Sequence, residues 1–138
     1  MRGDGAAPPR RHRGLASPGA AAREGAAQTG RKPGLNGGII ATVLDCHGVS
    51  TAIADAHQQE GRAIGSEPEI WCATASMTVD YLRPTPLGVP LELRSTVVTR
   101  DDRRTSVDCV LEADGKERAR ARVVAVRVPA EWKHGGTR

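Results

Sequence analysis

The longest run of apolar and small residues in the chain has the spacing of a helix. After Asn36, such residues recur at intervals of three and four up to residue 59, which is typical of a helix with a buried face. Asn36 is suited to cap the helix, because its side chain can accept a hydrogen bond from a first-turn backbone N–H. Gly61 supplies a stop signal. The sequence therefore predicts one helix over 37–59.

From residue 70 the hydrophobic pattern changes to alternation, which is typical of strands. We expect four strands, over about 70–81, 90–99, 104–113 and 117–128. In the first of them, strict alternation places Thr74 on the face opposite to Tyr81. Asp114-Gly115 is a two-residue hairpin signal between the last two strands. One helix available to cover a sheet of long antiparallel strands predicts an α+β layer fold.

Residues 1–33 are rich in Ala, Gly, Pro and Arg and show no apolar periodicity. We expect a disordered tail there, a folded domain over 34–129 and a polar tail over 130–138. Arg10-Arg11 is not followed by a leucine-rich segment, so the sequence does not favour export or import. A solvated linker or a start placed too far upstream are the favoured interpretations of this segment, and a basic tail that binds polyanions is the third.

The charge of the chain is concentrated in the same segment. Residues 1–33 carry a net charge of +5, whereas the whole chain carries +4, so the remainder is at −1. With only 2% aromatic residues the domain also lacks stacking platforms, and nucleic acid is not an expected partner. We find no apolar run of membrane-spanning length and expect no membrane partner. Three well-separated cysteines predict neither disulfides nor a metal site, but small buried residues in a cytoplasmic protein.

Asp45 is an acidic residue inside the apolar helix, and its position needs a reason. At 100° per residue its neighbours on the helix surface are small, and they are Gly38, Ala41, Thr42, Gly48, Val49 and Ala52. This pattern predicts a shallow groove beside Asp45 that a ligand or another backbone could enter. Pairing with an arginine or exposure to solvent is the alternative. His47 lies on the opposite face and is expected to be a packed core histidine.

Two motifs together resemble a known family. Asn36-Gly37-Gly38 followed by Asp45, and Tyr81-Leu82-Arg83-Pro84 at the end of a strand, resemble the hot-dog acyl-CoA thioesterases of the phenylacetyl-CoA (PaaI-like) type over residues 34–128. The resemblance implies one long central helix wrapped by a curved antiparallel sheet. It also implies a homodimer or homotetramer that hydrolyses acyl-CoA, with the thioester as substrate and no further cofactor or metal. Relatives carry a strand before the helix, and residues 1–33 show no strand pattern. We therefore expect that this strand is missing or that the start is not authentic.

The resemblance also implies roles for individual residues. The free N–H groups of Gly37, with Gly38, would form an oxyanion hole, and Asp45 would act as nucleophile or general base. Thr74 would position the attacking water. Asn36, which stands where relatives carry His, would contact substrate together with Gly38 and Arg83. Arg83, Arg100, Arg103 and Arg104 are candidates to meet the phosphates of CoA, since arginine suits phosphate geometry, and a solvated strand edge is the alternative for them. A non-catalytic module that binds acyl-CoA or an acyl carrier protein is the alternative.

The spacing of Gly37 and Asp45 adds a constraint of its own. Eight residues span about 12 Å along a helix, so one carbonyl cannot touch both residues of the same chain. If both act, they must come from different chains across a two-fold axis. The sequence thus predicts a dimer with two shared sites.

Overall fold

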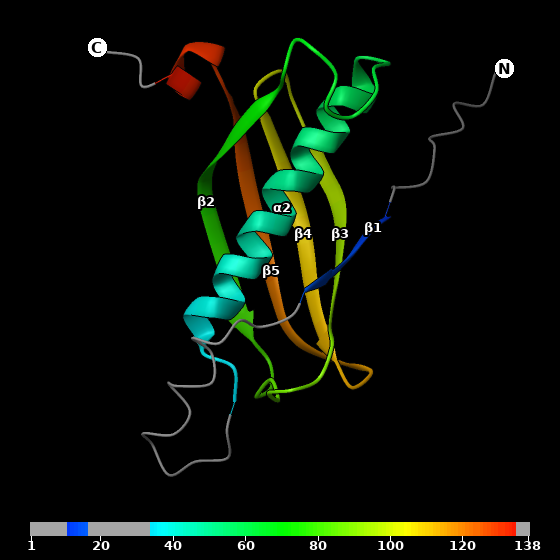
Figure 1. Ribbon diagram of the computed structural model, residues 1–138. Helices are drawn as coiled ribbons and strands as arrows, with labels where there is room; N and C mark the ends of the chain where they lie inside the picture. Colours follow the sequence, from blue (N-terminus) through cyan, green and yellow to red (C-terminus); the bar gives the residue numbers. More distant parts are fainter. Residues whose placement is uncertain (1–10, 17–33, 135–138) are drawn as a thin grey trace, which may run out of the picture.

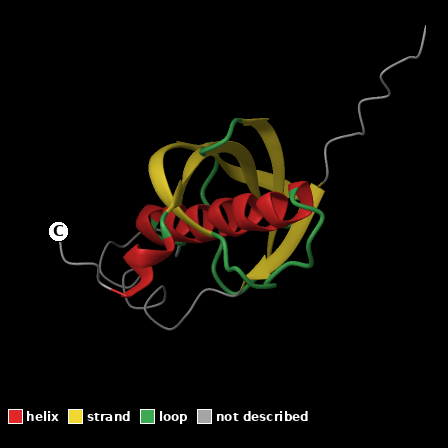
Figure 2. Cartoon of the chain, turned by 90° about the horizontal axis from the view of Figure 1, so that it is seen from above, coloured by secondary structure: helices red, strands yellow, loops and turns green. Residues whose placement is uncertain are grey.

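The computed structural model describes residues 11–16 and 34–134. A single long helix lies across one face of a five-stranded antiparallel sheet (Figure 1). Seen from above, the strands curve around the helix (Figure 2). This arrangement confirms the predicted fold class, a central helix wrapped by a curved antiparallel sheet.

The helix and strands follow one another in a simple order. The elements are β1 (Arg11–Ala16), α2 (Gly37–Gln59), β2 (Trp71–Tyr81), β3 (Leu91–Arg100), β4 (Arg104–Ala113), β5 (Lys116–Val128) and the short 3₁₀ helix η1 (Ala130–His134). In the sheet the order is β1-β3-β4-β5-β2, so β1 and β2 form the two edges. The predicted helix and the four predicted strands agree with these bounds to within one residue.

The start and end of α2 follow the predicted capping signals. Asn36 has an extended backbone (φ −61°, ψ 137°), and its side-chain oxygen accepts a hydrogen bond from the Gly38 N–H at 2.7 Å. At the other end the Glu60 N–H reaches the Ala56 carbonyl, and Gly61 follows with φ 67°. Asn36 is therefore confirmed as the N-cap, and Gly61 takes the left-handed conformation that glycine accommodates best.

Small residues bring the helix close to the sheet. A Cβ built on Gly48 would lie 2.7 Å from a methyl carbon of Val123 and 3.2 Å from the Cys109 sulfur. Ala52, one turn further on, is fully buried. Gly48 and Ala52, which were predicted to open a groove beside Asp45 to a ligand or another backbone, admit the neighbouring strands and leave no space for a ligand. They pack against β4 and β5, and Asp45 lies at the edge of that contact.

The hairpin between β4 and β5 has the predicted turn. Asp114 and Gly115 both have positive φ, 52° and 69°, as a two-residue turn matching the twist of the strands requires. Inward-facing residues of both strands, Val107, Cys109, Leu111, Ala119, Ala121 and Val123, are buried beneath the helix. The alternation of these two strands therefore matches the sequence prediction.

A strand exists before the helix, contrary to the expectation drawn from residues 1–33. β1 pairs antiparallel with β3, from Arg11 opposite Thr96 to Ala16 opposite Leu91. An edge strand receives its order from backbone hydrogen bonds to a neighbour, so it does not need apolar periodicity of its own. The remainder of the predicted tails, residues 1–10, 17–33 and 135–138, lies outside the described residues.

β2 contains an irregularity that the sequence pattern did not indicate. Thr74 lies opposite Ala125 and Ser76 lies opposite Val124, so Ala75 is an extra residue, a β-bulge. The bulge shifts the alternation by one position. As a result Thr74 and Tyr81, which are seven residues apart, both face α2, and their predicted placement on opposite faces is wrong.

Two further expectations are also modified. α2 is long and apolar enough to cross a bilayer, with a mean hydropathy of 1.3 over its best window, although no run of that length was expected. Here it packs on the sheet as a core helix does.

Of the three cysteines, Cys109 is buried and Cys72 is half-buried, but Cys46 is exposed, so the expectation that all three are buried is wrong.

Candidate active site

The first turn of α2 presents one backbone N–H group that the fold leaves available. The Gly38 N–H is used by the Asn36 side chain, and the Ile39 and Ile40 N–H groups both point to the Asn36 carbonyl at 3.1 Å. Within the part of the chain that the structure describes, no hydrogen bond is formed by the Gly37 N–H. This donor lies at the positive end of the helix dipole, where a developing negative charge is stabilised.

Tyr81 covers this turn from the end of β2. Its hydroxyl donates a hydrogen bond to the Gly37 carbonyl oxygen at 2.7 Å. A Cβ built on Gly37 would lie 3.3 Å from two carbons of the Tyr81 ring. A glycine is therefore needed here for close contact with the ring, in addition to any role in admitting a ligand.

Asp45, two turns along the helix, meets Thr74 of β2. The Thr74 hydroxyl donates to an Asp45 carboxylate oxygen at 2.5 Å. Asp45 is half-buried and Thr74 is exposed. Among the side chains of residues 34–132 we find no arginine or lysine paired with Asp45. The carboxylate is thus held by one hydroxyl and remains available as a base or nucleophile.

The structure brings some of the predicted site residues together and separates others. Asp45 and Thr74 are in contact, and Asn36, Gly37 and Gly38 form the helix start. The two groups are separated by eight residues of helix, about 12 Å at the usual rise. The two groups of candidate residues therefore lie at separate positions on the helix, and each is called here a candidate half-site.

The remaining candidates have structural partners. Arg83 is exposed and donates to the Glu117 carbonyl at 2.9 Å. Arg100, considered for phosphate binding, is engaged by Asp55 instead. His47 is half-buried, and its backbone carbonyl accepts from the Thr51 hydroxyl. Of these, Arg83 lies nearest in sequence to Tyr81 and so to the helix start.

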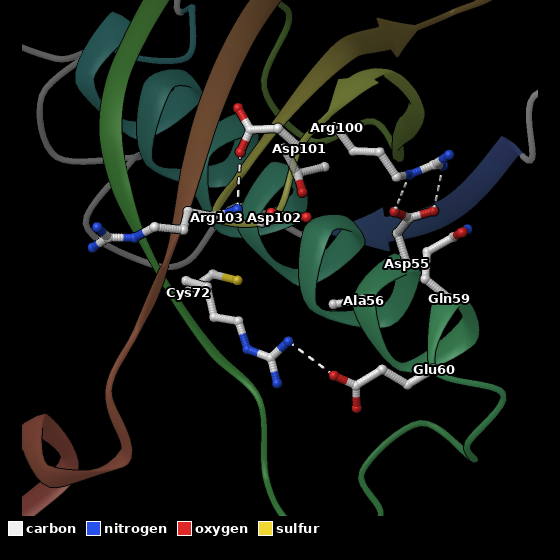
Figure 3. Close-up of a pocket in the computed structure, with 11 residues that line it drawn as sticks. Asp55, Ala56, Gln59, Glu60, Cys72, Arg100, Asp101, Asp102 and Arg103 are labelled. Carbon is white, nitrogen blue, oxygen red and sulfur yellow. Dashed lines mark hydrogen bonds and ion pairs between the residues drawn. The ribbon is translucent and has the colours of Figure 1, made fainter.

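A cavity of about 370 Å³ lies at the other end of α2, between the helix and the ends of β3 and β5 (Figure 3). Four of its charged side chains form two ion pairs. Asp55 receives two hydrogen bonds from Arg100, both at 2.8 Å, and Glu60 pairs with Arg127 at 2.9 Å. Asp101 accepts two backbone N–H groups, which hold the pKa of its carboxyl below the usual range. Ion pairs and backbone hydrogen bonds thus engage Asp55, Glu60 and Asp101, so we do not assign a reactive centre to this cavity.

Cysteine chemistry is not favoured at the helix–sheet contact. Burial, with smaller contributions from Asp108 and Asp45, raises the pKa of Cys109 to about 12. Burial also raises the pKa of Cys72. Both thiols are therefore protonated at neutral pH and are poor nucleophiles. No group of three potential metal ligands gathers within the described residues.

Comparison with protein families identifies the class of this chain. Residues 34–120 match the family model of the thioesterase superfamily, and the chain belongs to that family. The match begins just before the helix cap and ends within β5. It therefore includes both half-sites.

Solved structures show the same fold. A thioesterase superfamily protein from Shewanella loihica is 28% identical and aligns over 94% of this chain and 88% of its own, with a TM-score of 0.61. A phenylacetic acid degradation-related protein from Ralstonia eutropha is 20% identical, over 84% and 74% of the two chains, with a TM-score of 0.56. A Thermus thermophilus thioesterase complexed with coenzyme A and zinc is 18% identical, over 86% and 79%, with a TM-score of 0.59. A search of curated proteins gives no match.

Sequence analysis missed two features of the site. The Tyr81 contact with Gly37 was not expected, and neither was the bulge at Ala75. The sequence held one signal for the bulge, because Thr74 was a site candidate and Tyr81 belonged to the second motif of the resemblance, yet the two lie an odd number of positions apart, seven. Two positions seven residues apart share a face of a strand only if one extra residue is inserted.

Proposed function

We propose that this chain is an acyl-CoA thioesterase of the phenylacetyl-CoA type, which hydrolyses the thioester to a free acid and CoA. The observation that carries the proposal is the Asp45 carboxylate, held by Thr74 at 2.5 Å and without a cationic partner among the side chains of residues 34–132, within a thioesterase superfamily domain. The coenzyme A found in the Thermus thermophilus relative supports the substrate class.

In this proposal the site is completed by a second copy of the chain. Gly37 and Asp45 of one chain are too far apart for one carbonyl, whereas a two-fold axis brings Gly37 of one chain to Asp45 of the other. β2 is an edge strand that carries Thr74 and Tyr81 on its helix-facing side. An unpaired strand edge of this length is suited to pairing with the same strand of a second chain.

The reaction then follows from the two half-sites. The thioester oxygen accepts a hydrogen bond from the Gly37 N–H, which stabilises the oxyanion as the carbonyl carbon becomes tetrahedral. Asp45 either removes a proton from the attacking water or attacks the carbon itself to form an anhydride that water then cleaves. In both routes the C–S bond breaks and the CoA thiolate takes up a proton. Thr74 orients the carboxylate. We assign to the exposed Arg83, which also donates to the Glu117 carbonyl, a contact with a phosphate of CoA.

The direct test is release of free thiol from a panel of acyl-CoAs, followed with a thiol reagent. We expect turnover by the native chain and a loss of at least about 1000-fold in kcat for Asp45→Asn. Turnover unaffected by Asp45→Asn would exclude this mechanism. Binding of acyl-CoA without turnover of any member of the panel would instead support the non-catalytic binding module.

The oxyanion donor is tested by a matched pair of variants at Gly37. Gly37→Pro removes the N–H, and proline is tolerated at the first helical position when the preceding residue is extended, as Asn36 is. Gly37→Ala keeps the N–H and adds a methyl group against the Tyr81 ring. Loss of one donor is expected to lower kcat about 100-fold or more in Gly37→Pro. A similar loss in both variants would show that steric crowding, and not the N–H, matters.

A further inference from the structure

Tyr81 is an exposed aromatic residue that makes its polar contact with the helix start. About half of the residue is exposed (53%), yet its hydroxyl reaches the Gly37 carbonyl at 2.7 Å and its ring lies 3.3 Å from where a Cβ on Gly37 would stand. A tyrosine placed only for packing would bury its ring, and one placed only for solubility would not need this hydrogen bond. The contact therefore has a local purpose at Gly37.

The peptide group that joins Gly37 to Gly38 is held from both sides. Its N–H is taken by the Asn36 side chain, and its carbonyl oxygen accepts the Tyr81 hydroxyl. Just upstream, the Leu35 N–H donates to the Thr85 carbonyl at 2.8 Å. Two successive glycines at a helix start would otherwise be free to fray, because glycine has the widest range of backbone conformations.

We propose that Tyr81 is a positioning residue that fixes the Gly37 N–H for the thioester oxygen. This inference rests on the proposed function and adds a residue to it. An oxyanion donor is effective only if its direction is set before the charge develops, since reorientation during the reaction costs part of the stabilisation. Tyr81 supplies that rigidity from the neighbouring strand.

The bulge at Ala75 makes this arrangement possible. Because of the extra residue, β2 directs Thr74 to Asp45 and Tyr81 to Gly37 of the same helix. One strand thus positions both half-sites of its own chain. In the two-fold dimer these half-sites belong to different active sites, so each β2 supports both.

Tyr81→Phe is the first test, because it removes the hydroxyl and keeps the ring against Gly37. We expect kcat to fall about tenfold while KM stays within about twofold, since the oxyanion contact matters most in the transition state. Trp71→Phe is the matched control. It removes the polar N–H of an aromatic residue on the same strand, where the indole donates to Glu69, and should leave kcat unchanged. A melting temperature for each variant separates activity from folding.

The deciding test combines Tyr81→Phe with Gly37→Pro. If Tyr81 acts through the Gly37 N–H, its substitution has no further effect on kcat once that N–H is gone. A second, equal loss of about tenfold in the Gly37→Pro background would overturn the proposal, because Tyr81 would then act elsewhere. An unchanged kcat in Tyr81→Phe would also overturn it. Neither result would affect the proposed function, which depends on the response to Asp45→Asn.

Discussion

Two aspartates lie ten residues apart in the same apolar helix, and they differ in what surrounds them. Asp55 is 6% exposed and receives two guanidinium hydrogen bonds from Arg100. Asp45 is half-buried and receives one hydroxyl hydrogen bond from Thr74. The Asp55 carboxylate is paired with a cation and links the end of β3 to the helix. The Asp45 carboxylate is bound by an uncharged hydroxyl. The partner, and not the residue type or the element, distinguishes the structural acid Asp55 from Asp45, which we propose to be reactive.

The largest effect is expected when Asp45 is given a guanidinium partner of the kind that Asp55 has in Arg100. Thr74→Arg places a guanidinium where the hydroxyl was, so that the carboxylate is ion-paired and becomes a weaker base and nucleophile. We expect a loss of about 100-fold in kcat or more. The matched variant Thr74→Val removes the hydroxyl without adding charge and should cost about tenfold. Steady-state thiol release measures both. Equal effects of the two variants would contradict the importance of charge at Asp45.

A smaller effect is expected when Asp55 loses its charge. Asp55→Asn leaves Arg100 without a bidentate acceptor and should lower the free energy of unfolding by about 1–3 kcal/mol, below the range for fully buried pairs because the Arg100 side chain is 45% exposed. The activity of the folded protein should be retained. Asp45→Asn should give the opposite result, with activity lost and stability changed by less than about 0.5 kcal/mol. Urea unfolding measures the stability of both variants, and thiol release measures their activity. A loss of activity in folded Asp55→Asn would contradict the purely structural role of Asp55.

The smallest expected effect is a pH dependence of the free energy of unfolding, which arises from the Cys109 thiol near Asp45. The pKa of Cys109 is raised from 9.0 to about 12, chiefly by burial and in part by the charges of Asp108 and Asp45. The folded state therefore favours the protonated thiol. Above pH 9 the unfolded chain loses its proton first, so stability falls as pH rises towards 12, by at most about 1.4 kcal/mol per pH unit.

Urea unfolding of the reduced protein at pH 8 and pH 10 measures this slope, with Cys109→Ala as the reference. The variant is less stable at both pH values because of the cavity, but its stability should fall less between them. Identical slopes in the two proteins would show that folding does not raise the pKa of Cys109.

The parts of the fold that depend on local patterns could be predicted from the sequence. The helix over 37–59 has an apolar period and an Asn36 cap, and the Asp114-Gly115 turn follows from its residues. β1 could not be predicted, because its order comes from pairing with β3. The bulge at Ala75 was hidden by a run of small residues, Ala73 to Ser76, in which neither face is clearly apolar.

The candidate site was predictable in its residues but not in its contacts. Asp45, Gly37 and Thr74 were found from residue type and motif, and the structure adds that Thr74 binds Asp45 and that Asn36 leaves the Gly37 N–H available. The pairing of Asp55 with Arg100 joins residues 45 positions apart. Neither residue has a local signal for such a contact, so sequence reasoning considered Arg100 for phosphate instead.

The central claim, that each site combines Asp45 of one chain with Gly37 of another, is tested most directly by mixing two inactive variants. Asp45→Asn and Gly37→Pro chains are unfolded together and refolded, and mixed dimers are verified by native mass spectrometry. Each mixed dimer has one intact site and one doubly defective site. We predict recovery of about a quarter of native activity, because half of the dimers are mixed and half of their sites are intact. Activity no higher than the average of the two parent variants, with mixed dimers present, would contradict the shared site.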